Sequence, residues 1–116
     1  MLRCFLILSL VLAQQAVLAL NLGFLKNAPI SKMNADDTSM LSAAIQQALT
    51  DNTDNQELSW NNDKTGSNGT VKVLRSYEAH NTNCRTILLY NVSHGESATS
   101  QFDFCRSRNG EWKVLK

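Results

Sequence analysis

The sequence holds few of the residues on which catalytic and metal sites most often depend. It has two histidines, three cysteines and no Gly-x-Ser-x-Gly motif of a serine hydrolase. His80 and His94 fall in predicted turns at opposite ends of the predicted sheet, so we expect solvated turn residues rather than ligands of one metal ion. We therefore predict no catalytic set, no metal site and no cofactor, and a protein that is not an enzyme.

Neither sign of charge prevails in the chain. It carries 11 Lys and Arg against 10 Asp and Glu over 116 residues, a length that supports one domain. This balance argues against nucleic acid or an anionic membrane surface as the main partner. Four basic residues cluster near the end, and we interpret them as a solvated face: Arg106, Arg108, Lys113 and Lys116.

Residues 1–19 have the pattern of a secretory signal peptide. A short basic start precedes an apolar stretch over residues 4–13, and Val17-Leu18-Ala19 offers acceptable residues before a cut. An uncleaved anchor is the alternative, but two glutamines at 14 and 15 interrupt the apolar run before it reaches the ~20 residues that a span requires. We expect cleavage after Ala19, followed by a linker over residues 20–35, which contain the only proline.

Residues 36–116 are predicted to form an α+β domain that begins with an amphipathic helix at about residues 38–50. The segment Asp36-Asp37-Thr38-Ser39 supplies side-chain oxygens for an N-cap. Apolar residues then recur at helical spacing: Met40, Leu41, Ala44, Ile45, Ala48 and Leu49. This narrow stripe suits close packing on a sheet, although a partner-binding helix is the alternative.

About five antiparallel strands are predicted after the helix, at residues 57–61, 70–79, 84–92, 98–106 and 111–115. Residues 62–69 are dense in Gly, Asn, Asp and Ser and therefore predict a loop. Asn109-Gly110 is the favoured pair of a type I′ turn. That turn would oppose Val114 to Cys105 and Leu115 to Phe104.

The central hairpin is expected to hold a disulfide. A two-residue turn at His94-Gly95 sets a register in which Cys84 lies opposite Cys105 and Ile87 lies opposite Phe102. Cys4 would leave with the signal peptide, so an even pair remains in an exported protein. Two unrelated buried thiols are the alternative.

Two further features leave more than one interpretation. Trp60 and Trp112 are either core anchors, which we favour, or a ligand-stacking pair. The segments beginning at Asn68 and Asn91 fit the N-glycosylation sequon, which would matter only in a eukaryotic host.

Several residues recur in an order that is typical of one family. A Trp, a Thr-Gly-x-x-Gly loop, a Tyr, two Cys-Arg pairs and a Gly-x-Trp follow one another, after a helix that contains Asp37: Trp60, Thr65, Gly66, Gly69, Tyr77, Cys84, Arg85, Cys105, Arg106, Gly110 and Trp112. In this order, residues 36–116 resemble the C-terminal domain of the rickettsial seventeen-kilodalton surface-antigen family. The resemblance implies a small exported protein of the Gram-negative envelope, with a structural or interaction role and no enzymatic activity.

The sequence departs from that family pattern in two respects. It has no lipidation cysteine at the predicted cleavage site and no glycine-zipper segment before the domain. We therefore expect a protein without a lipid anchor. It would be a free periplasmic domain, or one held there or at the periphery of the outer membrane by envelope proteins. The alternatives are a small-ligand or enzymatic pocket between helix and sheet, lined by Trp60, Tyr77 or Trp112, and a secreted effector-like protein.

The two arginines that follow the cysteines are predicted to be structural. In the register above, Arg85 and Arg106 share the face opposite the disulfide. We expect them to pair with acids such as Asp103 or Glu78, or with loop carbonyls.

Overall fold

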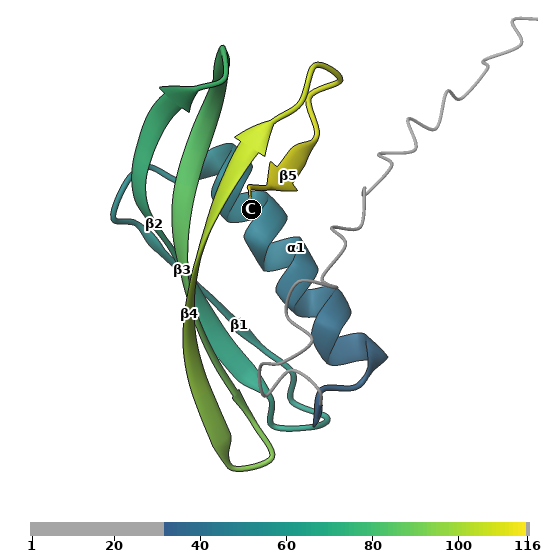
Figure 1. Ribbon diagram of the computed structural model, residues 1–116. Helices are drawn as coiled ribbons and strands as arrows, with labels where there is room; N and C mark the ends of the chain where they lie inside the picture. The colour runs from purple at the N-terminus through teal and green to yellow at the C-terminus, as the bar shows by residue number, and fades with distance from the viewer. Residues whose placement is uncertain (1–31, 116) are drawn as a thin grey trace, which may run out of the picture.

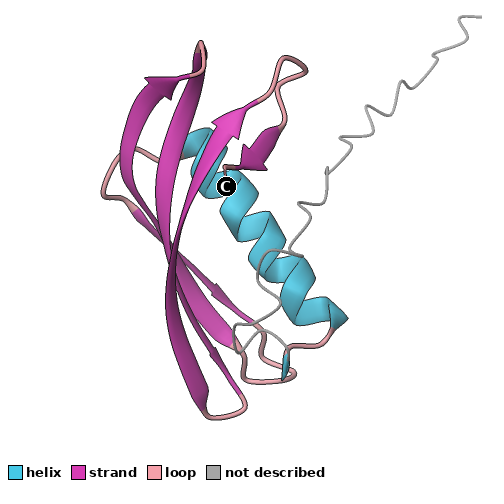
Figure 2. Cartoon of the chain, viewed as in Figure 1, coloured by secondary structure: helices cyan, strands magenta, loops and turns pink. Residues whose placement is uncertain are grey.

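The computed structural model describes residues 32–115, so the predicted signal peptide and most of the predicted linker lie outside the described residues. The helix α1 comes first, and five strands follow it: α1(Ala35–Asp51), β1(Glu57–Asn61), β2(Asn68–Ala79), β3(Thr82–Ser93), β4(Glu96–Arg106) and β5(Trp112–Val114). The strands pair as antiparallel neighbours in chain order, and α1 crosses one face of the curved sheet (Figures 1 and 2). The predicted α+β class, with one helix and five strands, is confirmed.

The helix begins earlier than the sequence indicated, because its N-cap is Asn34. The Asn34 side chain accepts the Asp37 N–H at 2.8 Å, and the Asp37 carboxylate accepts the Asn34 N–H at 3.1 Å. This reciprocal capping box places Asp36 and Asp37 in the first turn, where the positive end of the helix dipole stabilises acidic side chains. The predicted start near residue 38, with a cap among residues 36–39, was therefore wrong.

The register of the central hairpin agrees with the prediction. Cys84 lies opposite Cys105 and Ile87 opposite Phe102, and the two cysteines form a disulfide. The turn residues His94 and Gly95 both have positive φ, at 51° and 77°, as a type I′ turn requires.

The predicted register of the last strand was wrong by one residue. Phe104 lies opposite Val114, and Cys105 lies opposite Lys113. Gly110 has a φ of 85°, whereas Asn109 is not among the residues with positive φ, and the Asn109 side chain accepts the Glu111 N–H at 3.2 Å. The result is a longer turn with a bulge at glycine in place of a two-residue turn, and it brings Trp112 onto the helix face of the sheet.

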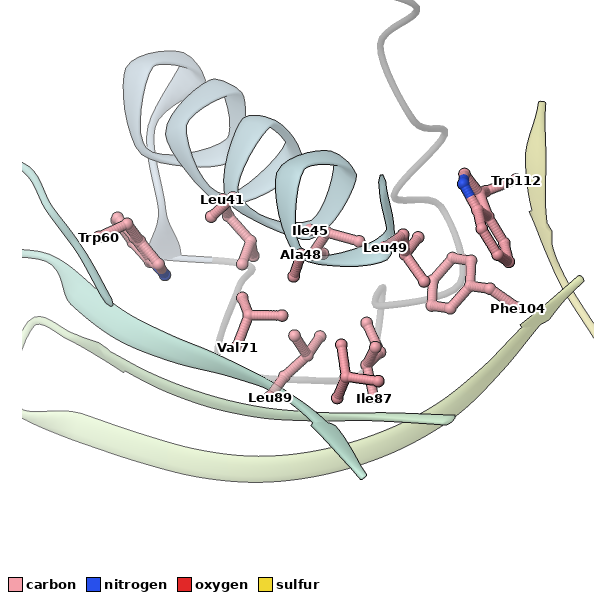
Figure 3. Close-up of a cluster of buried hydrophobic side chains, with 12 residues drawn as sticks. Leu41, Ile45, Ala48, Leu49, Trp60, Val71, Ile87, Leu89, Phe104 and Trp112 are labelled. Carbon is pink, nitrogen blue, oxygen red and sulfur yellow. The ribbon is translucent and has the colours of Figure 1, made fainter. Parts of the chain in front are cut away.

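The core lies between α1 and the concave face of the sheet (Figure 3). Apolar side chains from the helix and the sheet form this layer: Leu41, Ala44, Ile45, Ala48, Leu49, Val71, Val73, Ile87, Leu89 and Phe104. Trp60 and Trp112 belong to the same cluster, and Figure 3 shows them at its opposite ends. They are therefore core anchors, as we predicted, and not a stacking pair.

A bulge in β2 changes which side chains face the helix. Val73 lies opposite Ile87, whereas Arg75 lies opposite Thr86, so Leu74 is an extra residue in the strand. Beyond the bulge, Ser76 and Glu78 take the helix-facing positions of β2.

Candidate functional site

Asp37 is the centre of a buried polar network at the N-terminal end of α1. Its side chain has no exposed surface. The carboxylate accepts hydrogen bonds from Asn62 Nδ2 at 2.7 Å, from the Thr65 hydroxyl at 2.7 Å and from the Ser67 hydroxyl at 3.0 Å. Ser67 Oγ also lies 2.9 Å from Ser93 Oγ at the end of β3. The network thus ties the loop between β1 and β2 to both the helix and the sheet.

The carboxylate of Asp37 is ionised, and the protein supplies all of its hydrogen bonds. Burial raises its pKa, but hydrogen bonds from Thr65, the Asn34 N–H, Asn62 and Ser67 outweigh that effect and hold the pKa below its usual value. Each carboxylate oxygen accepts two hydrogen bonds, one oxygen from Asn62 and Thr65 and the other from Asn34 and Ser67. Its hydrogen-bonding capacity is therefore filled by the protein itself, which indicates a structural role.

The two glycines of the neighbouring loop motif have separate structural reasons. A Cβ on Gly69 would lie 2.4 Å from the Tyr90 carbonyl oxygen and 2.6 Å from both Trp60 Nε1 and Asn91 Oδ1. Only glycine therefore allows Trp60 to pack over this point of β2. Gly66 has a φ of 79°, in the left-handed region that glycine adopts without strain.

Arg85 holds the opposite, C-terminal end of α1. It comes from the centre of the sheet, on β3, and the last turn of α1 has no basic residue of its own. The five N–H groups of its guanidinium have five acceptors within 3.3 Å: Ser76 Oγ, the carbonyl oxygens of Ala48, Leu49 and Asn52, and Asp54 Oδ1. A cation at this position also complements the negative end of the helix dipole.

This geometry corrects one of the predicted partners of Arg85. The expected carbonyl partners are present, but the acid is Asp54 and not Asp103 or Glu78. Asp103 lies on the other face of the sheet, where it accepts a hydrogen bond from Thr86. Arg106 contacts the Gly110 carbonyl oxygen, at 3.4 Å.

An open groove with a volume of about 400 Å³ lies beside Arg85 and the acceptors that it binds. Residues from β2, β3 and β5 line it: Ser76, Tyr77, Glu78, Asn83, Cys84, Arg85 and Trp112. Glu78 and Asn83 lie opposite each other near the tip of the β2–β3 hairpin, and both are exposed. Because the protein already uses every N–H of Arg85, the Glu78 carboxylate and the Asn83 amide are the polar side chains best placed to meet a ligand.

Trp112, on β5, forms one wall of the groove. The Arg106 guanidinium carbon lies 5.4 Å from the centre of its ring. The Trp112 side chain is only 7% exposed, and within the described residues its Nε1 has no hydrogen-bond partner. A buried donor without an acceptor costs about 1–3 kcal/mol, so this atom lowers the stability of the fold.

The predicted site residues divide between the two ends of α1. Those near the groove are Tyr77, Cys84 and its disulfide partner Cys105, Arg85, Arg106, Gly110 and Trp112, whereas those near Asp37 are Trp60, Gly66 and Gly69. Sequence reasoning missed the side chains that surround Asp37, namely Asn62, Thr65, Ser67 and Ser93. The available signals were the Thr-Gly-x-x-Gly motif, which contains Thr65, and the density of Asn, Thr and Ser in the loop after Trp60.

Within residues 32–115, the cysteine and histidine side chains do not gather at one place. Cys84 and Cys105 are joined in the disulfide, and His80 and His94 lie in different hairpin turns. Residues 32–115 contain no group of three or more His, Cys, Asp or Glu side chains that could hold a metal ion. Within the same residues, no helix has both the length and the apolar character needed to cross a membrane.

Comparison with known proteins gives one match. The family model described as "17 kDa outer membrane surface antigen" matches residues 47–113, which is more than half of the chain. The match begins in the last part of α1 and ends within β5, so it includes the groove and both cysteines. No curated protein and no solved structure matches the chain.

Proposed function

The chain belongs to the 17 kDa outer membrane surface antigen family, and from this premise we propose that it is an exported, non-enzymatic interaction module of the Gram-negative envelope. Its place is the periplasm or the periphery of the outer membrane, and its partners are envelope proteins. The family assignment supports association with the envelope. The groove beside Arg85 supports binding as the activity.

The groove carries the proposal because it is the part of the family pattern that combines exposed polar groups with buried aromatic surface. The Glu78 carboxylate and the Asn83 amide are exposed in its lining, and Trp112 offers an apolar wall. An extended protein segment could give a carbonyl group to the Asn83 amide and a basic side chain to Glu78, while an apolar side chain packs against Trp112. The groove therefore suits a short segment of a partner that carries a Lys or an Arg.

A small-ligand pocket is the second candidate, since about 400 Å³ lies within the range of small-molecule sites. The buried acid that would favour such a pocket is absent from the groove lining, however, because Asp37 lies at the other end of α1. An interaction groove remains the better account of these residues.

Two measurements test the proposed function. Fractionation of the native cell should recover the protein with the envelope. A photo-crosslinking amino acid at Asn83, in the groove, should give a covalent adduct with an envelope protein, and Glu78→Gln should weaken that adduct. The matched control is the same photo-crosslinker at Ser59, an exposed position on β1.

The control should give no adduct with the same protein. Recovery of the chain in the cytoplasm would contradict the proposal. So would adducts of equal yield at Asn83 and Ser59.

A further inference from the structure

The outer edge of β4 is open along most of its length in the part of the chain that the structure describes. On one side β4 pairs with β3 from Glu96 to Cys105. On the other side β5 pairs only with Phe104, Cys105 and Arg106 (Figure 1). Residues 97–101 therefore form a strand edge with a partner on one side.

The disulfide indicates which main-chain groups face this open edge. The Cα atoms of Cys84 and Cys105 lie 4.0 Å apart, a spacing that fits a non-hydrogen-bonded pair. The main-chain N–H and C=O of Cys105 therefore point away from β3. Because this direction alternates along a strand, the groups of Asp103, Gln101, Thr99 and Ser97 point the same way. The hydrogen bond from the Leu115 N–H to the Asp103 carbonyl oxygen, at 2.7 Å, agrees with this assignment.

The sequence of residues 97–101 has none of the features that usually prevent strand pairing. Residues 97–101 read Ser-Ala-Thr-Ser-Gln, with no proline and no charge, and they pair with β3 without a bulge. Natural edge strands commonly carry lysine, proline or a bulge for protection. At the other edge of the sheet, β1 is only five residues long and begins with Glu57. The β4 edge is thus the less protected of the two.

We propose that β4 pairs with β4 of a second copy of this chain, antiparallel across a two-fold axis at Thr99. This register opposes Thr99 to Thr99 and Ser97 to Gln101 of the second copy, so the outward main-chain groups of both strands find partners. Thr–Thr is a favourable cross-strand pair. The two charged residues that flank the segment do not meet, because Glu96 lies opposite Phe102 and Asp103 opposite Gly95. The interface is isologous, as in most homodimers.

The register also fits the limits of the open edge. Thr99 is the middle of the segment between Glu96 and Phe102, so a pairing centred there does not compete with β5 for residues 104–106. A pairing centred nearer the C-terminal end would run into β5. The interface uses no residue that lines the groove, so its failure would leave the proposed function untouched.

Sedimentation of the purified chain with its disulfide intact, over a series of protein concentrations, tests this dimer. Thr99→Pro removes the outward N–H from both copies and so deletes two central hydrogen bonds. It should weaken self-association by about 10- to 100-fold. Thr99→Ala keeps the N–H and is the matched control, with an expected change of less than about fivefold.

A charge exchange at the two-fold axis locates the interface. Thr99→Lys and Thr99→Glu each place like charges directly opposite each other, so each variant alone should dimerise about fivefold more weakly than the native chain. An equal mixture of the two should restore association, because Lys then faces Glu. Circular dichroism and disulfide mapping establish that each variant is folded.

Three results would overturn the proposal. The first is a native chain that stays monomeric at a protein concentration of about 1 mM, because the dissociation constant of the dimer would then be too high for specific association. The second is a folded Thr99→Pro variant that associates as well as Thr99→Ala. The third is a mixture of the Lys and Glu variants that associates no better than either variant alone.

Discussion

The two ends of α1 are held by charged side chains of opposite sign, yet one end is closed and the other lies beside an open groove. Asp37 at the N-terminal end and Arg85 at the C-terminal end both complement the helix dipole. Asp37 is bound mainly by side chains of one loop, which fill the space around it. Arg85 binds mainly main-chain carbonyls, so the side chains beside it remain available for other contacts.

This difference indicates where binding can evolve without loss of the fold. At the closed end, loss of the amide of Asn62 or of the hydroxyl of Thr65 or Ser67 removes a hydrogen bond from a buried carboxylate. At the open end, Glu78 and Asn83 can change while the carbonyl contacts of Arg85 stay in place. The open end is therefore the end at which partner specificity is expected to reside.

Loss of Asp37 should have the largest effect on stability. Asp37→Ala leaves four donors without their acceptor, and two of them, on Asn62 and Ser67, are buried, so we expect the free energy of unfolding to fall by about 3–5 kcal/mol. Urea unfolding followed by tryptophan fluorescence, with the disulfide intact, measures this loss. Asp36→Ala is the control, because Asp36 is exposed in the same helical turn and should cost less than about 1 kcal/mol. Equal losses for the two variants would show that the network does not hold the closed end.

Loss of Arg85 should have a smaller effect, because solvent can reach the groove beside it. Arg85→Met removes the donors from three carbonyl oxygens, and we expect a loss of about 2–3 kcal/mol in the same unfolding experiment. Arg85→Lys should not restore stability, since an ammonium lacks the planar set of five donors. Arg75→Met, an exposed arginine on the opposite face, is the control and should cost less than about 1 kcal/mol.

Two outcomes would contradict this role of Arg85. One is full stability of the Arg85→Lys variant, and the other is a loss of stability in Arg75→Met as large as that in Arg85→Met. In the first case, one point charge near the helix end would be sufficient. In the second case, the effect would reflect loss of any long basic side chain from the sheet.

The central hairpin could be predicted from the sequence because its register depends on one local turn. His94-Gly95 is a strong turn signal, and the cysteine spacing agreed with it independently. The turn at Asn109-Gly110 gave a wrong register, because in the folded chain only Gly110 of this pair has positive φ and the turn closes between Ser107 and Glu111. The helix start was also missed, because the Asn34 side chain accepts the Asp37 N–H and caps the helix earlier than predicted.

The candidate site was only partly predictable. Asn62, Thr65 and Ser67 are ordinary loop residues, and only the folded chain brings them to Asp37 from about 25 to 30 positions away. The carbonyl oxygens that bind Arg85 carry no sequence signal at all, because every residue has one. The groove likewise depends on the bulge at Leu74, which turns Ser76 and Glu78 toward the helix face.

The smallest expected effect is a difference in pH dependence between the acids at the two ends. Hydrogen bonds lower the pKa of Asp37 in spite of its burial, and the Ser76 hydroxyl, followed by Arg85, lowers the pKa of Asp54. A carboxyl with a lowered pKa in the folded state stabilises the fold above about pH 4, where the unfolded group titrates, and this contribution is lost as the pH falls through the folded pKa.

The stability advantage of the native chain over Asp37→Asn should therefore shrink as the pH falls from about 6 to about 3. Its advantage over Asp54→Asn should be small throughout and further reduced by salt, because the Asp54 side chain is 45% exposed. Urea unfolding at a series of pH values, at low and high salt, measures both differences. An advantage over Asp37→Asn that grew toward low pH would mean that the carboxylate is protonated in the fold, and that the closed end is held by a neutral group.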